Sequence, residues 1–234
     1  MSDRTIGILG GMGPEATADL FMEITRLTPA RSDQDHLRII SYSNPKVPDR
    51  TAAILHGGAD PVPELIESAR LLERAGAQII AIPCNTAHYY LRQIRAAVGI
   101  EVLDMIGETL AEFRRLLPRA TTAGLLAATG TVSAGVYREP FERQGVRLLV
   151  PGTEGQAAVH EGIGRVKAGD RDPSIRQTFQ AEGARLAGRG AEAVILGCTE
   201  IPLAFDPAGV DYVTLNATRI LAAAALRAAR GDAA

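Results

Sequence analysis

The chain has 234 residues, of which 46% are hydrophobic and 22% are charged, and this balance is typical of a folded protein with a buried core. Its 25 basic and 27 acidic residues give a net charge of −2, which excludes the broad positive surface that nucleic acid or anionic lipid usually requires. The apolar stretch near the N-terminus is too short for a secretory signal, and no run of residues is apolar enough to span a membrane. The two cysteines form no CxxC pair, so we expect a cytoplasmic protein without a disulfide framework or a structural zinc site.

Short apolar runs alternate with longer segments of helical periodicity, which is typical of βα units around a mostly parallel sheet. In chain order, we expect a strand at 5–9, a helix at 14–27, a strand at 36–42, a helix at 61–75, a strand at 78–82 and a helix at 87–98. The order then begins again, with a helix at 105–116, a strand at 122–127, a loop at 129–133, a helix from about 135, a strand at 146–150, a helix at 173–189, a strand at 193–196 and a helix at 217–230. The predicted fold class is therefore α/β.

The second half of the chain resembles the first. The segment GILGG at 7–11 matches GLLAA at 124–128 in kind, and IPCNT at 82–86 matches LGCT at 196–199 at nearly the same separation. Two matches at nearly one spacing indicate an internal repeat. We predict two similar, pseudo-twofold related domains with mostly parallel sheets, one of residues 1–105 plus 212–234 and one of residues 106–211, with an active site in the cleft between them.

Cys84 and Cys198 each follow an apolar strand directly and precede a polar segment that begins a helix. Ligands bind at this carboxyl edge of parallel strands, and amide groups there favour an anion such as a thiolate. Free cysteine is also among the most buried residue types, so two inert core cysteines are the alternative. Two thiols facing each other across a cleft would remove a proton from one face of a carbon centre and deliver a proton to the other face. The pattern therefore favours inversion of a carbon centre without a cofactor.

The glycine-rich segment GMGPEA at 11–16 formally fits the fingerprint of a dinucleotide-binding loop. The acidic residue that this fingerprint needs after the second strand is missing, because the segment SNP stands there at 43–45, so we favour a tight loop around a small anion over NAD. Cys84 and His88 lie one helical turn apart, but two further ligands are not assigned, and we predict no metal site. We expect His88 to pack or form a hydrogen bond beside the cysteine.

Two basic residues and one threonine are candidates for binding a carboxylate. Arg50 follows the second strand, and a guanidinium at that edge suits bidentate binding of a carboxylate, although most arginines of such a chain lie in solvent. Lys167 is one of only two lysines, although a residue at a helix end before a glycine would look the same. Thr131 follows the first strand of the second half, where its hydroxyl either holds a carboxylate or forms a local turn.

Three motifs together resemble the aspartate/glutamate racemase superfamily, in particular its aspartate racemase branch: GGMGPEAT at 10–17, PCNTAH at 83–88 and GCTE at 197–200. Segments 44–51 and 124–137 also look like that branch, so the resemblance spans nearly the whole chain. Glutamate racemases usually show an Asp-Ser-Gly opening and a Gly-Cys-Thr-His second motif, whereas this chain has Gly10-Gly11-Met12 and Glu200. Aspartate is therefore favoured as the substrate. Asn216 stands where an aspartate is common in the family.

The resemblance implies an enzyme, commonly a homodimer, that interconverts L- and D-aspartate without a cofactor by a two-base mechanism. In this comparison Cys84 and Cys198 match the two acid/base thiols, and Arg50 and Lys167 match the residues that hold the carboxylates of the substrate. The other positions assigned to substrate binding are Gly11, Met12, Asn85, Thr86, Thr131, Thr199 and Glu200. Racemisation of glutamate or of many amino acids, a reaction of the maleate isomerase or decarboxylase type, and plain binding of a small anion are the alternatives.

Overall fold

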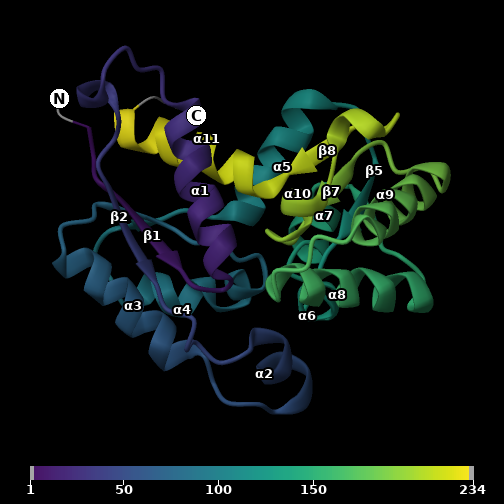
Figure 1. The fold of residues 1–234 in the computed structure, drawn as a ribbon, viewed down its shortest axis with the longest axis horizontal. Helices are drawn as coiled ribbons and strands as arrows, with labels where there is room; N and C mark the ends of the chain where they lie inside the picture. Colours follow the sequence, from purple (N-terminus) through teal and green to yellow (C-terminus); the bar gives the residue numbers. More distant parts are fainter. Residues whose placement is uncertain (1–2, 232–234) are drawn as a thin grey trace.

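The computed structural model describes residues 3–231, which form two α/β halves, each built on a four-stranded parallel sheet (Figure 1). The strands of the first sheet are β1 (Ile6–Gly10), β2 (Ile39–Ser43), β3 (Ile79–Ala81) and β4 (Glu101–Val102). Those of the second are β5 (Thr122–Leu126), β6 (Arg147–Leu149), β7 (Val194–Leu196) and β8 (Thr214–Asn216). The spatial orders β2-β1-β3-β4 and β6-β5-β7-β8 are equivalent, which confirms the predicted α/β class and the repeated order of elements.

Helices cover both faces of each sheet. Those of the first half are α1 (Pro14–Leu27), α2 (Arg50–His56), α3 (Val62–Arg74) and α4 (Leu91–Ala96), together with the 3-10 turns η1 (Asp33–Asp35) and η2 (Thr86–Tyr90). The others are α5 (Met105–Leu116), α6 (Thr129–Ser133), α7 (Arg138–Arg143), α8 (Thr153–Lys167), α9 (Pro173–Gly188), α10 (Ile201–Ala204), η3 (Pro207–Gly209) and α11 (Ala217–Arg230). Within residues 3–231, no helix combines the length and the apolar character needed to cross a bilayer.

Each sheet has an apolar cluster on either face. In the first half, α1 and α11 cover one face and α3 and α4 the other, with buried residues such as Leu20 and Leu72 against the strands. In the second half, α8 and α9 cover one face through residues such as Phe179, and α5 and α7 cover the other through Phe113 and Phe141. Burial on both faces explains the nearly continuous apolar runs that marked these strands in the sequence.

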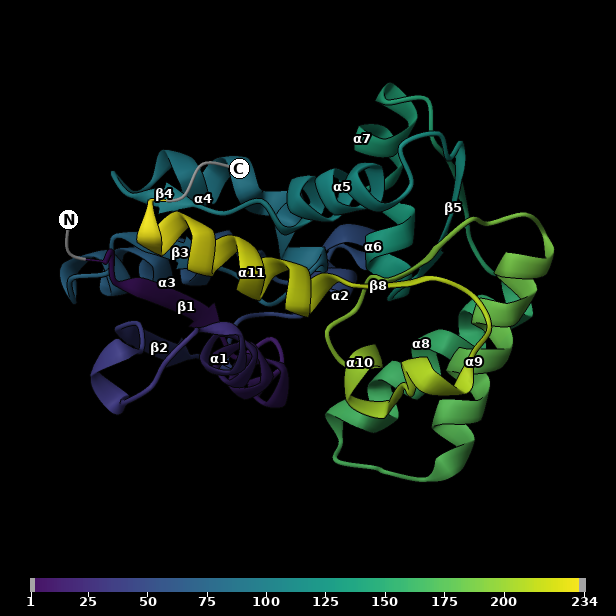
Figure 2. The same cartoon turned by 90° about the horizontal axis from the view of Figure 1, so that it is seen from above.

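The last helix, α11, connects the two halves. It begins at the end of β8 in the second sheet and runs to the first half, where it packs against α1 while also contacting α5 (Figure 2). Because β8 pairs with β7, residues 214–216, which the sequence assigned to the first half, lie in the second sheet, and the chain then returns to the first half along α11. Asn216 is the N-cap of α11, and its side-chain oxygen accepts a hydrogen bond of 3.1 Å from the amide of Arg219.

Some local predictions were wrong where tertiary contacts decide the conformation. Residues 129–133 form the helix α6 and not a loop, and Gly130 in this helix packs so closely on α2 that a Cβ there would lie 2.5 Å from the hydroxyl of Thr51. The helix expected from about 135 begins at Arg138, and the helix expected at 87–98 is split into η2 and α4 at Tyr90. Helices α2 and α8 were not predicted as separate elements, and both border the cavity described next.

Candidate active site

A cavity of about 330 Å³ between the two halves has both cysteines in its wall. Cys84 follows β3 and Cys198 follows β7, which are the corresponding strands of the two sheets, and the two residues are 5% and 7% exposed. The wall also contains seven more of the residues selected from the sequence: Met12, Arg50, Asn85, Thr86, Lys167, Thr199 and Glu200. Folding thus brings the two cysteine motifs to one cavity.

Three hydrogen bonds join the two halves at the side chains around this cavity. The hydroxyl of Tyr137 donates to Oδ1 of Asn85 at 2.6 Å, and the hydroxyls of Thr86 and Thr131 lie 2.7 Å apart. The hydroxyl of Thr199 lies 3.4 Å from the carbonyl oxygen of Pro83. Burial raises the pKa of Tyr137, so its hydroxyl stays protonated and donates. The bond from Tyr137 fixes the amide of Asn85, whose Nδ2 is buried without a partner and remains free to donate to a bound molecule.

His88 orders the backbone around Cys84. The amide of Met105 donates to Nε2 of His88 at 3.1 Å, so Nδ1 carries the hydrogen and donates to the carbonyl oxygen of Cys84 at 2.8 Å. Burial lowers the pKa of His88, which keeps the ring neutral. Both ring nitrogens are thus used by the backbone, which confirms the expectation that His88 forms a hydrogen bond beside the cysteine.

Cys198 has an acidic partner. Its Sγ donates to Oε2 of Glu200 at 2.9 Å, and both side chains are buried. Burial and the negative charge of Glu200 raise the pKa of Cys198 well above that of an ordinary thiol, while Lys167 acts in the opposite direction. Cys198 therefore rests as the protonated thiol, in the form that can donate a proton.

Arg50 is a buried cation at the border of the cavity. It is 8% exposed and begins α2, and its Nη1 donates to the carbonyl oxygens of Val47 and Pro48 at 3.2 and 3.0 Å. Its Nε is buried without a hydrogen-bond partner. A buried guanidinium with a free donor is expected to bind an anion, because an unpaired buried charge is costly.

Lys167 is the last residue of α8 and supplies the second cation, although much of its side chain is exposed. Burial lowers the pKa of Lys167, but the acidic groups around it, Cys198, Glu200 and Cys84, outweigh this effect and raise it. The ammonium group therefore stays protonated at neutral pH.

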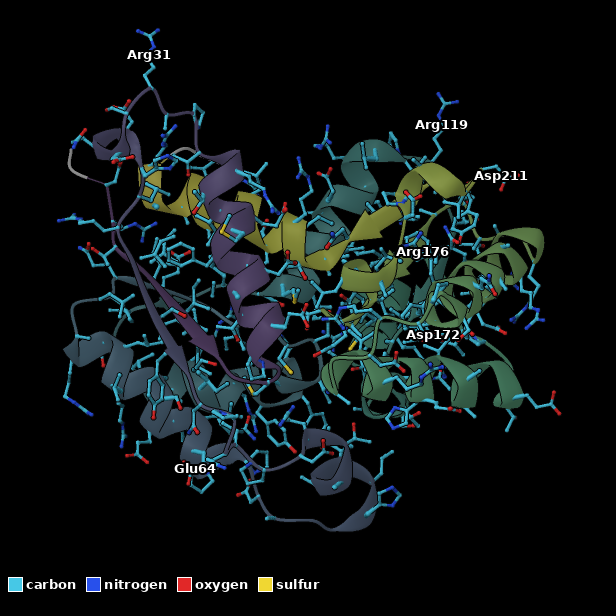
Figure 3. All side chains as sticks on the ribbon, viewed as in Figure 1. Arg31, Glu64, Arg119, Asp172, Arg176 and Asp211 are labelled. Carbon is cyan, nitrogen blue, oxygen red and sulfur yellow. The ribbon has the colours of Figure 1, made fainter. Side chains whose placement is uncertain are left out.

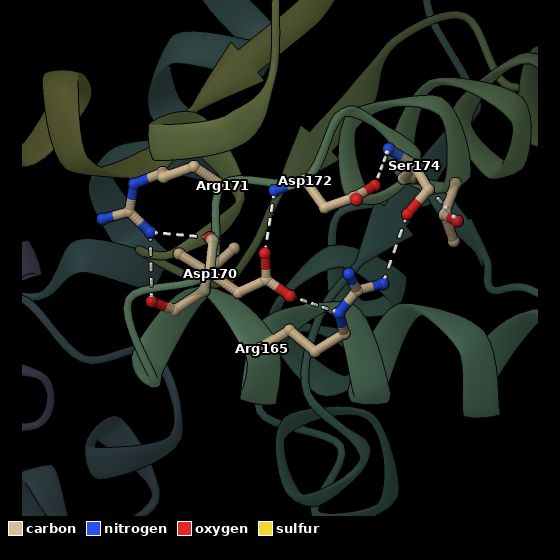
Figure 4. A network of polar contacts seen from close by, with 7 residues as sticks. Arg165, Asp170, Arg171, Asp172 and Ser174 are labelled. Atoms are coloured by element: carbon tan, nitrogen blue, oxygen red, sulfur yellow. Dashed lines mark hydrogen bonds and ion pairs between the residues drawn. The ribbon is translucent and has the colours of Figure 1, made fainter.

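The turn that follows Lys167 is held by a network of polar contacts (Figure 4). Arg165 donates through Nε to Asp170 at 2.7 Å, and Asp170 in turn accepts a hydrogen bond of 2.8 Å from the amide of Asp172. Arg171, in the same turn, forms an ion pair with Glu15 at the start of α1. This contact links the turn after α8 to α1 in the first half of the molecule.

The family model for Asp/Glu/hydantoin racemases matches residues 9–225. The chain belongs to this racemase family. Among curated proteins, it is 27% identical over 224 residues to the broad specificity amino-acid racemase RacX of Bacillus subtilis, with 93% of this chain and 94% of that protein covered. A glutamate racemase of Deinococcus radiodurans is 28% identical over 137 residues, which cover 56% of this chain and 44% of that protein.

Solved structures of racemases share the fold of this chain. An aspartate racemase of Picrophilus torridus superimposes with a TM-score of 0.87 at 28% identity, over 97% of this chain and 94% of that one. An aspartate racemase homologue of Pyrococcus horikoshii OT3 gives a TM-score of 0.78 at 25% identity, over 97% and 99%. A glutamate racemase of Francisella tularensis, at 16% identity and a TM-score of 0.68, shows the same fold. These findings confirm the resemblance to the superfamily and to its aspartate racemase branch.

Two predicted site residues of this racemase lie outside the cysteine cavity. Thr131 is not in the wall of this cavity, and its hydroxyl forms a hydrogen bond with the hydroxyl of Thr86, which is. Gly11 lines a second cavity of about 320 Å³, and Met12, Asp49, Arg50, Lys167 and Glu200 line both cavities. Only a glycine suits position 11, because its φ is +95° and a Cβ there would lie 2.3 Å from the backbone of Asn44.

Sequence reasoning missed several residues of the cysteine cavity of this racemase, including Thr51 and His56 on α2 and His160, Ile163 and Gly164 on α8. Those on α8 share a helical face with Lys167, and this periodicity is the signal that was available to find them. His160 and His56 approach the cavity from different halves. Within residues 3–231, no three His, Cys, Asp or Glu side chains are grouped so as to hold a metal ion.

Tyr137→Phe is expected to lower the free energy of unfolding by about 1–3 kcal/mol, because it leaves the buried Oδ1 of Asn85 without its donor. Urea denaturation followed by circular dichroism measures the change. Tyr89→Phe is the matched control, since Tyr89 is 51% exposed and its loss of a hydroxyl should leave the stability unchanged. Equal stability of the Tyr137 variant and the wild type would contradict this role.

Cys84→Ala leaves Cys198 as the only cysteine and makes its titration measurable. The thiolate absorbance in the ultraviolet is expected to appear at a pH well above that of the urea-unfolded variant, whose thiol should titrate near its ordinary pKa of about 8.5. Adding Glu200→Gln removes one of the two causes of the shift, so the midpoint should move back towards the unfolded value. A folded midpoint at or below the unfolded one would contradict the assignment of Cys198 as the resting thiol.

Proposed function

We propose that this protein is a cofactor-independent racemase that interconverts L- and D-aspartate, with Cys84 and Cys198 as base and acid. The observation that carries this proposal is the placement of both cysteines in the wall of one cavity, at the ends of corresponding strands in the two halves. A two-base mechanism needs groups on opposite faces of one carbon atom, and two similarly built halves that enclose a cavity supply such an arrangement.

The proposed reaction begins with Cys84 as the thiolate and Cys198 as the thiol, since the raised pKa of Cys198 keeps its proton in place. The thiolate takes the α-proton, and the electron pair of the broken C–H bond delocalises into the α-carboxylate. Cys198 then gives its proton to the opposite face. The product is the other enantiomer, and the two cysteines have exchanged their protonation states.

The charges of the cavity suit a dicarboxylate. Arg50 and Lys167 offer one cation for each carboxylate of aspartate, and the free Nδ2 of Asn85 offers a further donor. Charge that develops on the α-carboxylate during proton removal is stabilised by such donors, because they are fixed before the reaction. Binding of the second carboxylate then contributes to organising the site around the α-carbon.

Broader specificity is the second candidate function. The cavity of about 330 Å³ has the size of a small-molecule site, and a relative over nearly the full length carries the name of a broad specificity amino-acid racemase. The acidic residues Asp49 and Glu200 in the wall also offer partners for a cationic side chain. A cytoplasmic location and a homodimeric state remain predictions.

Proton NMR of L- and D-aspartate in heavy water, with reduced enzyme, tests the proposal. The expected result is loss of the α-proton signal from either enantiomer, together with growth of the opposite enantiomer on a chiral column. Glutamate, alanine and lysine, measured in the same way, separate aspartate specificity from a broader range, and the vinyl proton signal of fumarate growing from maleate reports isomerisation of maleate. Absence of exchange from every amino acid by folded enzyme would overturn the proposed function.

A further inference from the structure

Racemisation by two thiols leaves the enzyme in the wrong state for its next turnover in the same direction. After the proposed reaction Cys84 is a thiol and Cys198 a thiolate, so Cys198 must regain a proton and Cys84 must lose one before another molecule of the same enantiomer reacts. The thiolate form of Cys198 is the unfavourable one, because burial and the charge of Glu200 disfavour it. A proton path to Cys198 is therefore a requirement of the proposed function.

Within residues 3–231, one carboxylate is in direct contact with this thiol. Oε2 of Glu200 accepts the hydrogen bond from Sγ of Cys198 at 2.9 Å and lies 3.3 Å from the hydroxyl of Thr199. Its other oxygen, Oε1, is buried without a hydrogen-bond partner. A buried carboxylate oxygen without a partner is unusual and indicates a functional use.

Glu200 stands between two cavities. One is the cysteine cavity, and the other is the second cavity of about 320 Å³, whose wall contains neither cysteine. Oε1 lies beside Gly13 in the wall of the second cavity, where a Cβ would come 3.3 Å from this oxygen. Pro14, Glu15 and Pro45 at that cavity are exposed, so it communicates with solvent.

We propose that Glu200 is the positioning residue that returns the proton to Cys198, passing it from water in the second cavity to the thiol while the cysteine cavity exchanges product for substrate. In this step the carboxylate of Glu200 takes a proton from a water molecule in the second cavity, which leaves as hydroxide. The carboxyl group then gives this proton to the Cys198 thiolate, which forms the S–H bond and restores the carboxylate of Glu200. The same steps run backwards when the opposite enantiomer is converted. This inference rests on the proposed function and assigns Glu200 a role beyond substrate binding.

Steady-state kinetics of Glu200→Gln test the proposal, because the return of the proton takes place on the free enzyme. Such a step limits kcat at saturating substrate and leaves kcat/KM unaffected, since at low substrate the two protonation states have time to equilibrate. We expect kcat to fall about tenfold or more in both directions, kcat/KM to change less than about threefold, and KM to fall with kcat. Small proton donors such as imidazole or formate should restore kcat, since glutamine keeps the shape of the side chain but cannot relay a proton.

The controls separate this role from a structural one. Glu64→Gln, at a partly exposed glutamate of α3 that lines neither cavity, should behave as the wild type (Figure 3). Equal losses in kcat and kcat/KM without rescue by buffer would show that Glu200 only orients Cys198. Unchanged kinetics would show that Glu200 neither orients Cys198 nor returns its proton. Either outcome overturns the inference. If Glu200→Gln does not fold, the same comparison of kcat with kcat/KM is made for Glu200→Asp, because the shorter side chain places the carboxyl group one methylene farther from Cys198. A wild type that racemises nothing would instead overturn the proposed function.

Discussion

Cys84→Ala and Cys198→Ala are each expected to lower kcat/KM for the interconversion of L- and D-aspartate by about 1,000-fold or more, since general acid and base catalysis contributes factors of this order. Both cysteines lie in the wall of the same cavity, yet their roles differ with the direction of the reaction. The variant with only one thiol retains a base for one enantiomer and lacks the acid on the other face.

This asymmetry gives a sharper result than loss of activity alone. Cys198→Ala should still exchange the α-proton of one enantiomer with heavy water, without inverting it, because the Cys84 thiolate removes the proton and returns a deuteron to the same face. Cys84→Ala should do the same only at a pH high enough to ionise Cys198. The two variants should act on opposite enantiomers. Proton NMR combined with chiral chromatography measures both quantities.

Circular dichroism of the same variants gives the control, because both cysteines are buried and a loss of folding would imitate a loss of catalysis. Cys→Ser variants keep the size of the side chain and should show the same pattern. Full racemisation by either alanine variant would contradict the two-thiol mechanism, and exchange of the same enantiomer by both variants would contradict the placement of the thiols on opposite faces.

The fold and the positions of the cysteines were accessible from the sequence because they depend on local patterns. Strands buried on both faces appear as apolar runs, and the end of such a run places Cys84 and Cys198 at the carboxyl edge of a sheet. Helices α1 and α11 were predicted with their observed bounds, since Pro14 and the start of α11 are clear local signals. Arg50 and Lys167 were selected with help from the resemblance to a family.

The remaining features depend on contacts between distant parts of the chain. Thr-Gly-Thr-Val-Ser at 129–133 has low helix propensity, yet it is helical in the folded chain, where Gly130 packs on Thr51 of α2. Tyr137 could not be assigned to the site, because nothing in the sequence pairs it with Asn85, its partner 52 residues away. The hydrogen bond between Cys198 and Glu200 is local, but whether the two side chains turn towards each other depends on the folded cavity.

Arg50→Ala is expected to lower kcat/KM for aspartate about 100-fold or more, because two charge-assisted hydrogen bonds of about 1.5 kcal/mol or more each would be lost, and about 1.4 kcal/mol corresponds to a factor of ten. Arg50→Lys distinguishes the effect of the positive charge from the effect of the planar guanidinium. An ammonium group keeps the charge but cannot bind a carboxylate through two parallel hydrogen bonds. Arg119→Ala, at an exposed arginine that projects into solvent, is the control and should change nothing (Figure 3).

Inhibition by succinate and by propionate shows which carboxylate Arg50 holds. Succinate has both carboxylates of aspartate and propionate has one, so the wild type should bind succinate more tightly. If Arg50 binds the side-chain carboxylate, Arg50→Ala should lose this preference while binding propionate as before; if it binds the α-carboxylate, both inhibitors should weaken together. Unchanged binding of both would mean that Arg50 serves only the carbonyl oxygens of Val47 and Pro48, and that Lys167 alone supplies the positive charge for the substrate.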